Sequence, residues 1–277
     1  NMDFYFKRSY CGPVKLVIFD WAGTMIDYGS CAPAGAFIEG YRRQGIAVTM
    51  AQARAPMGLG KWEHIQAIGQ MEPVAAQWQE KYGRSPTNSD IDKMYQDFVP
   101  VLLDILPNFT QLIPGAVETF NYLKKRGIKV AGTTGYFAEA MAICQAAAAK
   151  QGYTPDFTIC ATQVSAGRPL PWMIYRAMNE LDVYPPAAVV KVGDTKPDIQ
   201  AGLNAGVWTV GVAQAGNEVG LSESELHALP LEEQTRRVAK AKVTLAHEGA
   251  HFVGNTVANL PEIIEQLEEC LCRGERP

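Results

Sequence analysis

The apolar residues Val14 and Leu16–Phe19 form the stretch that most constrains the fold, because the run ends abruptly at Asp20. Large apolar residues follow one another there without the polar alternation of a strand that has one face in water. A short run of this kind predicts a strand that is buried on both faces of a parallel sheet. Such sheets place their chemistry at the carboxyl ends of the strands. We therefore expect Asp20 to lie at a functional edge, where Gly23 allows the chain to turn tightly.

Beyond Pro114, strand-like segments alternate with helix-like segments. The expected strands span residues 128–134, 157–161, 189–193 and 207–212, with a last one near 251–253. The expected helices span residues 116–126, 138–151, 171–181, 198–205, 231–246 and 261–272. This alternation predicts an α/β fold, with a doubly wound, Rossmann-like and mostly parallel sheet that carries helices on both faces.

The segment between the first strand and this alternation has helical patterns and no convincing strand. Helices are expected at residues 34–44, 61–70, 74–82 and 91–105, and Thr87 with Asp90 forms a capping box before the last of them. We therefore expect a core domain of residues 1–29 plus 108–277 and an inserted helical cap domain of residues 30–107.

Charge and cysteine content limit the class of protein. The chain has 277 residues and a net charge of −4 without a long basic run, so nucleic acid is not an expected partner. No stretch approaches the length of a membrane span, and the first residues lack the features of a signal peptide. The six cysteines are scattered without metal-ligand spacing, which favours reduced thiols in a cytoplasmic protein over zinc or disulfides.

Polar residues follow four of the predicted strands. In chain order they are Asp20; Thr133, Thr134, Gly135 and Tyr136; Arg168; and Asp194 with Asp198. Two carboxylates across a sheet edge suit Mg²⁺, a hydroxyl and a guanidinium suit phosphate oxygens, and Asp20 could act as a carboxylate nucleophile. Each residue alone has a simpler interpretation: a helix cap, a β-branched strand residue or a surface cation. Their recurrence at successive strand ends favours a site.

These motifs, DxxGT, a strand followed by Thr, a lone basic residue and GDTxxD, resemble the four motifs of the haloacid dehalogenase superfamily. The helical insert resembles the small cap domain of that superfamily. The resemblance implies that Asp20 is the nucleophile, Thr134 a phosphate-binding hydroxyl, Arg168 a charge-neutralising cation and Asp194 a Mg²⁺ ligand. It also implies that Asp198 supports the metal shell.

Ala22 is an informative departure from the phosphatases of the superfamily. They usually carry a second Asp at this position, two residues after the nucleophile, which protonates the leaving oxygen and later deprotonates water. The cap offers Lys61 in the sequence MGLGKWEH, at the expected start of a helix. If it is desolvated there, Lys61 would be a free amine able to attack a carbonyl, although a lone lysine is more often a surface residue. A nucleotide-binding phosphate loop does not fit, because Trp62 follows the lysine where Ser or Thr is required.

The segments FDWAGTxxDYG, MGLxKxxH, TTGY, GRPxPWM and KVGDTxxD together resemble one member family, the phosphonatases, over residues 14–258. That resemblance implies hydrolysis of the C–P bond of phosphonoacetaldehyde to acetaldehyde and phosphate, through a Lys61 imine and an Asp20 aspartyl-phosphate. It implies that Ala22 offers its backbone carbonyl to Mg²⁺. Further residues fall near the substrate: Met57, His64, Thr133, Gly135 and Tyr136.

His64 and the liberated amine are the candidates to activate water, and Ser30 stands where the family often has Cys. The resemblance also implies a homodimer, for which apolar cap positions such as those of Ala34–Tyr41 are candidates, unless they form the core of the cap itself.

Two other functions stay open at this point. One is a Mg²⁺-dependent phosphatase or phosphotransferase acting on a small phosphate ester, against which Ala22 counts. The other is a non-catalytic binding protein derived from the same fold, against which the joint presence of Asp20, Lys61, Arg168 and Asp194 counts.

Overall fold

A six-stranded, all-parallel sheet forms the centre of the computed structural model, which describes residues 9–277. The strand order is β3-β2-β1-β4-β5-β6. The strands are β1 (Leu16–Phe19), β2 (Lys129–Thr134), β3 (Phe157–Cys160), β4 (Val189–Gly193), β5 (Trp208–Val212) and β6 (Phe252–Gly254). The predicted doubly wound α/β fold is thus confirmed. Residues 1–8, which the expected core includes, lie outside the described part.

Strand β1 lies between β2 and β4, and its four residues are fully buried, as the unbroken apolar run predicts. Leu16 and Ile18 belong to one hydrophobic cluster, and Val17 and Phe19 to another. This alternation places one cluster on each face of the sheet. Phe19 is in register with Gly132 of β2 and Val192 of β4, so the residues that follow all three strands emerge at one edge.

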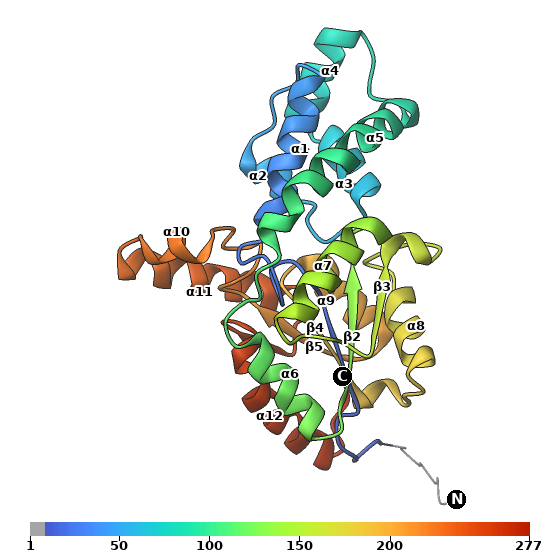
Figure 1. Ribbon diagram of the computed structural model, residues 1–277, viewed down its shortest axis with the longest axis vertical. Helices are drawn as coiled ribbons and strands as arrows, with labels where there is room; N and C mark the ends of the chain where they lie inside the picture. The colour runs from blue at the N-terminus through green and yellow to red at the C-terminus, as the bar shows by residue number, and fades with distance from the viewer. Residues whose placement is uncertain (1–8) are drawn as a thin grey trace, which may run out of the picture.

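Helices cover both faces of the sheet (Figure 1). Those packed with Leu16 and Ile18 are α8 (Trp172–Glu180) and α9 (Lys196–Ala205). Those packed with Val17 and Phe19 are α6 (Ala116–Lys125), α7 (Ala138–Lys150) and α12 (Leu260–Cys272). Two further helices, α10 (Glu223–His227) and α11 (Leu231–His247), lie beyond β5 and β6, where α11 contacts both strands.

The inserted helices gather above the carboxyl edge of the sheet (Figure 1). They are α1 (Cys31–Arg43), α2 (Met50–Arg54), α3 (Lys61–Gly69), α4 (Glu72–Tyr82) and α5 (Asn88–Ile105). The capping box of Thr87 and Asp90 is present at the start of α5. These helices share one continuous hydrophobic cluster with the sheet face that carries Phe19, so the cap packs directly on the core.

The apolar positions of α1 are used inside the cap. Ala34, Phe37 and Tyr41 are buried within this chain, where Phe37 stacks on Phe98 and on His64. Of the two uses suggested for this segment, the structure therefore supports the internal core. Among the described residues, no helix is both long and apolar enough to cross a membrane.

Candidate active site

A buried network of charges joins the ends of β1 and β4 to the loop after β3. Arg168 donates from Nη2 to Oδ1 of Asp20 at 2.7 Å and from Nη1 to Oδ1 of Asp198 at 2.6 Å. The same oxygen of Asp198 accepts from Nζ of Lys191 at 2.6 Å, and its Oδ2 accepts from the hydroxyl of Thr195, also at 2.6 Å. Both oxygens of Asp198 are thus occupied, so this residue orients the two cations.

Burial and charge act against each other on these groups. Burial raises the pKa of Asp20, and the Arg168 guanidinium only partly offsets this. For Asp198, burial is outweighed by Arg168 and Lys191, which together lower its pKa. The two carboxylates raise the pKa of Arg168, although burial alone would lower it. Arg168 is therefore a permanent cation beside Asp20.

Asp194 is the least compensated carboxylate of the site. It is fully buried, and burial followed by the charges of Asp20 and Asp198 raises its pKa well above the usual value. It accepts hydrogen bonds from the hydroxyl of Thr24 at 3.3 Å and from the backbone N–H of Asn217 at 2.8 Å, neither of which brings a full charge.

The donor set fits a divalent cation. One carboxylate oxygen of each of Asp20, Asp194 and Asp198 lies within 4.8 Å of the other two, although both oxygens of Asp198 already accept hydrogen bonds. The charge of Asp20 helps to raise the pKa of Asp194, so a proton or a cation beside the two carboxylates would be stabilising. Ala22 lines the same hollow, and no described residue donates a hydrogen bond to its carbonyl oxygen. An all-oxygen set of this kind suits Mg²⁺.

Residues at the end of β2 and just after it lie at the same hollow. Thr134 accepts a hydrogen bond from the backbone N–H of Tyr136 at 3.0 Å, which leaves its own hydroxyl proton free to donate into the hollow. Thr133 contributes its carbonyl oxygen, which lies 3.4 Å from Nη2 of Arg168, while its buried hydroxyl has no hydrogen-bond partner among residues 9–277. Gly135 packs against the Leu59 carbonyl of the cap.

Lys61, the first residue of α3, reaches this hollow from the cap. Its side chain is 7% exposed, and Nζ lies 4.9 Å from the centre of the Tyr136 ring and 5.6 Å from that of Phe37. No hydrogen bond or ion pair joins Nζ to another described residue. Burial and then the charge of Arg168 lower the pKa of Lys61 to about 8, against the opposing effect of Asp20 and Asp194. A lysine in this state is partly a free amine at neutral pH.

His64 lies one turn beyond Lys61 and is fully buried. Its Nε2 contacts the Ala53 carbonyl at 2.7 Å and therefore donates to it, and its ring stacks on Phe37 with centroids 3.8 Å apart. Burial and then Lys61 lower its pKa well below the usual value, so the ring is neutral, and Nδ1 is an acceptor that no described residue pairs with.

The cap is docked closely on the core around the hollow. Gly58 has φ +99° and lies where a Cβ would stand 2.3 Å from the Thr195 hydroxyl, so only glycine lets this cap loop approach. Met57, beside it, is buried and lines the hollow together with Asp20, Lys61 and Arg168. Asp20 is the only carboxylate in the lining.

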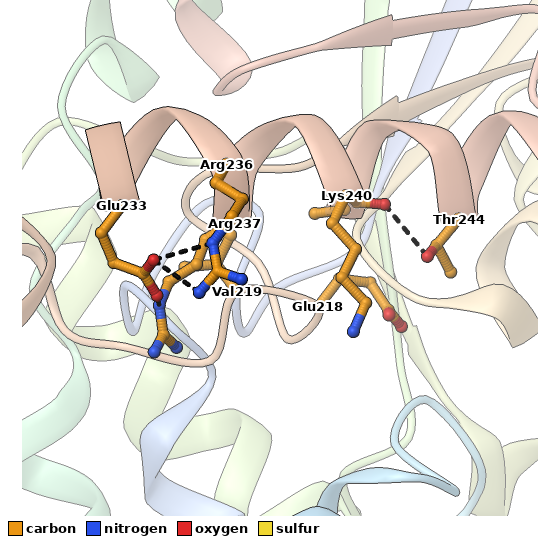
Figure 2. A pocket seen from close by; sticks show the side chains of 8 residues that line it. Glu218, Val219, Glu233, Arg236, Arg237, Lys240 and Thr244 are labelled. Atoms are coloured by element: carbon orange, nitrogen blue, oxygen red, sulfur yellow. Dashed lines mark hydrogen bonds and ion pairs between the residues drawn. The ribbon is translucent and has the colours of Figure 1, made fainter. Parts of the chain in front are cut away.

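Larger hollows in the described part of the chain lie away from this chemistry. Figure 2 shows a groove of about 330 Å³ between α11 and the loop that holds Glu218 and Val219. Three of its charged residues pair with one another, since Glu233 forms ion pairs with Arg236 and Arg237. We place the candidate active site at the smaller hollow, because only there, within the described residues, do a buried carboxylate, a desolvated lysine, a guanidinium and a threonine hydroxyl meet.

Three residues that sequence reasoning missed contribute to the site. Lys191 carried a signal, since a lysine inside the apolar strand β4 must find a buried partner. Asp27 is buried and accepts from the backbone N–H groups of Cys31 and Ala32 at 3.0 Å each, where it stabilises the start of α1. Asn217 carried no local signal, because its partner Asp194 belongs to another strand end.

Comparisons with known proteins agree with this geometry. A family model described as haloacid dehalogenase-like hydrolase matches residues 14–206. A Syntrophobacter fumaroxidans protein named phosphonoacetaldehyde hydrolase is 42% identical over 98% of this chain and 98% of its own length. A second protein of that organism, named phosphonoacetaldehyde hydrolase-like protein, is 43% identical over 98% of this chain and 99% of its own. The crystal structure of a phosphonoacetaldehyde hydrolase-like protein from Oleispira antarctica has a TM-score of 0.97 and 43% identity, with both chains fully covered. The chain therefore belongs to the phosphonoacetaldehyde hydrolase family of the haloacid dehalogenase-like hydrolases.

Proposed function

We propose that this protein hydrolyses the C–P bond of phosphonoacetaldehyde to acetaldehyde and phosphate. The observation that carries the proposal is the lining of one hollow by Asp20 and by the desolvated Lys61, with no second carboxylate. A phosphate ester needs a proton for its leaving oxygen, and Ala22 cannot supply one. A C–P bond needs instead an electron sink for the carbon that leaves.

Lys61 would provide that sink. The neutral amine attacks the aldehyde carbon and, after loss of water, forms a protonated imine. As Asp20 attacks phosphorus, the C–P bond breaks and its electron pair moves into the enamine. Protonation of the enamine carbon and hydrolysis of the imine then release acetaldehyde and return the amine, and water hydrolyses the aspartyl-phosphate to phosphate.

The remaining residues hold and neutralise the phosphoryl group. Thr134 donates its hydroxyl and Arg168 its fixed positive charge, which suits a transfer that depends mainly on positioning and electrostatics. Asp20, Asp194 and the Ala22 carbonyl would hold Mg²⁺, with Asp198 orienting the cations around them. The metal would supply positive charge at the phosphoryl oxygens.

The cap residues would serve the imine. Met57 and Tyr136 enclose the aldehyde end, with Thr133 and Gly135 beneath it. His64 offers the unpaired Nδ1 as a proton acceptor for the Lys61 amine or for water. We propose that the cap spans residues 30–107 and that its closure assembles the site and excludes water.

We also propose a cytoplasmic homodimer. The family resemblance supports the dimer, and the six free thiols support a reducing compartment. The contact would use exposed positions, because the buried side chains of α1 pack inside the cap; light scattering measures the mass.

The imine can be tested by reduction with cyanoborohydride in the presence of phosphonoacetaldehyde. We expect a covalent adduct at Lys61 by peptide mass spectrometry and a loss of phosphate release by roughly a thousandfold or more in Lys61→Ala. Asp20→Ala should still form the adduct without releasing phosphate.

The matched control is Lys93→Ala, which removes an exposed lysine from α5 of the same cap and should keep full activity. An active wild type without any adduct at Lys61 would rule out the imine. Robust turnover of p-nitrophenyl phosphate with none of phosphonoacetaldehyde would instead favour the phosphatase.

A further inference from the structure

Asn217 makes specific contacts in two directions at the boundary between core and cap. It lies in the loop that follows β5 and is 8% exposed. Its backbone N–H donates to Oδ2 of Asp194 at 2.8 Å. Its side-chain amide pairs with Arg54 of the cap: Oδ1 accepts from Nη1 of Arg54 at 3.1 Å, and Nδ2 donates to the Arg54 carbonyl at 3.3 Å.

Arg54 is the last residue of α2, and it also binds the segment that connects core and cap. Its Nη1 donates to the carbonyl oxygens of Gly29 and Ser30 at 2.8 and 3.2 Å. These two residues have φ values of +87° and +50°, so the connection takes a conformation that L residues rarely adopt. One guanidinium thus fixes both the connection to the cap and the loop that contacts Asp194.

The loop that holds Gly216 and Asn217 packs tightly against Asp194. A Cβ on Gly216 would stand 2.5 Å from Cβ of Asp194, so the backbone of the loop already touches this residue. Asn217 therefore cannot shift with Arg54 without changing its hydrogen bond to the Asp194 carboxylate.

We propose that Asn217 is a positioning residue that couples docking of the cap to the orientation of Asp194 for metal binding. The inference rests on the proposed role of Asp194 as a Mg²⁺ ligand. A docked cap holds Asn217 through Arg54, and Asn217 holds the Asp194 carboxylate in place. Lys61 enters the site by the same docking, so the amine and the metal site become ready together.

Such coupling is reciprocal. If docking of the cap strengthens Mg²⁺ binding, Mg²⁺ must favour the docked cap by the same factor. The effect of docking on Mg²⁺ binding means that Arg54, a cap residue that does not contact Asp194, should influence the metal affinity of the core.

The direct test is Mg²⁺ binding without substrate, followed by tryptophan fluorescence in wild type, Arg54→Ala and Asn217→Ala. We expect each variant to bind Mg²⁺ at least about fivefold more weakly. The double variant should be no weaker than either single variant, because both remove the same connection. Arg54→Lys keeps the charge without the planar fork, and we expect it to fall between wild type and Arg54→Ala.

Two matched controls separate this effect from general damage. Arg84→Ala removes a cap arginine whose ion pair is with Asp90 of the cap, far from the connection to the core. Glu218→Gln changes the neighbour of Asn217, whose side chain faces the groove along α11 (Figure 2). We expect Mg²⁺ affinity within twofold of wild type for both.

The reciprocal test measures the rate at which an amine reagent modifies Lys61, by peptide mass spectrometry with and without Mg²⁺. Mg²⁺ should slow the modification in wild type and have little effect in Arg54→Ala. The charge of the metal acts in the opposite direction, because a nearby cation lowers the pKa of Lys61 and makes it more reactive. Slower modification therefore reports docking.

The outcomes distinguish the two proposals. A wild type that does not bind Mg²⁺ would show that the metal site is wrong, and the coupling would fall with it. A wild type that binds Mg²⁺ beside an Arg54→Ala variant that binds it equally well, or single effects that add in the double variant, would overturn the coupling alone.

Discussion

Lys61 and Arg168 are two cations of one buried site, and their neighbours give them opposite protonation behaviour. Arg168 is held by Asp20 and Asp198 and keeps its proton. Lys61 has aromatic rings rather than carboxylates beside its Nζ, so burial dominates and lowers its pKa to about 8. The site therefore contains one fixed positive charge and one amine that is partly neutral near pH 7, as the proposed reaction requires.

This difference predicts the pH dependence of adduct formation. With a pKa of about 8, about a tenth of Lys61 is the free amine at pH 7, and the fraction rises roughly tenfold per pH unit below pH 7. The rate of cyanoborohydride trapping should rise in the same way and level off above pH 8. An unshifted lysine would give a rate that still climbs at pH 10, and this result would contradict the assignment. Mass spectrometry of the Lys61 peptide measures the rate, with the Lys93 peptide as internal control.

The turn between β1 and α1 depends on Asp27 rather than on an N-cap side chain. Ser30, at the N-cap position of α1, makes no side-chain capping bond, whereas the Asp27 carboxylate accepts from two N–H groups of the first helical turn. Burial raises the pKa of Asp27 to about 6, and these hydrogen bonds only partly offset it. Helix α1 is thus capped by a carboxylate whose charged form is destabilised by burial.

We expect Asp27→Ala to lower the free energy of unfolding by about 1–3 kcal/mol, since two N–H groups lose their acceptor. Asp27→Asn keeps a hydrogen-bond acceptor but removes the charge, so it measures the effect of the charge alone. Because the folded pKa is raised, the ionised form is the penalised one, and the contribution of Asp27 to stability falls as the pH rises from about 4 to about 6. Denaturant unfolding should therefore show the stability difference moving in favour of Asp27→Asn over this range. A constant difference would mean that Asp27 does not titrate there.

The elements that could be predicted from the sequence are those whose signal lies within the element. Strand β4 has the predicted bounds, and α5 follows its capping box, because hydrophobic period and caps are local. Helices α2 and α10 have five residues each, too few for a period to show, and were missed. The contact of Arg54 with Asn217 spans 163 positions and depends on how cap and core meet, which no local pattern encodes.

The candidate site divides in the same way. Its residue types at the strand ends, from Asp20 to Asp198, could be predicted because parallel strands end at one edge. The hydrogen-bond partner of each carboxylate oxygen could not be predicted. In the structure, Asp198 binds Arg168, Lys191 and Thr195, whereas Asp194 has no cation beside it.

At the scale of the whole molecule, the centre of the fold contains more negative than positive charge. Four buried carboxylates of the described residues, Asp20, Asp27, Asp194 and Asp198, face three buried cations, Lys61, Arg168 and Lys191. A divalent cation that binds only the folded state would relieve this excess and stabilise the protein by mass action, by about 2.7 kcal/mol at a hundredfold excess over the dissociation constant. The fold without metal therefore carries an electrostatic cost at its functional edge.

Whether Asp194→Asn unfolds at a higher or a lower temperature than wild type should accordingly depend on Mg²⁺. Without metal it removes the least compensated charge and should unfold at a temperature equal to or above that of wild type. With saturating Mg²⁺ the wild type should gain roughly 5–10 °C, while the variant gains little, so the order is exchanged. Calorimetry with EDTA and with Mg²⁺ measures both, and Asp104→Asn, at an exposed position of α5, should follow wild type throughout. A full Mg²⁺ shift in Asp194→Asn would place the metal elsewhere, because the shift requires the carboxylate that the variant lacks.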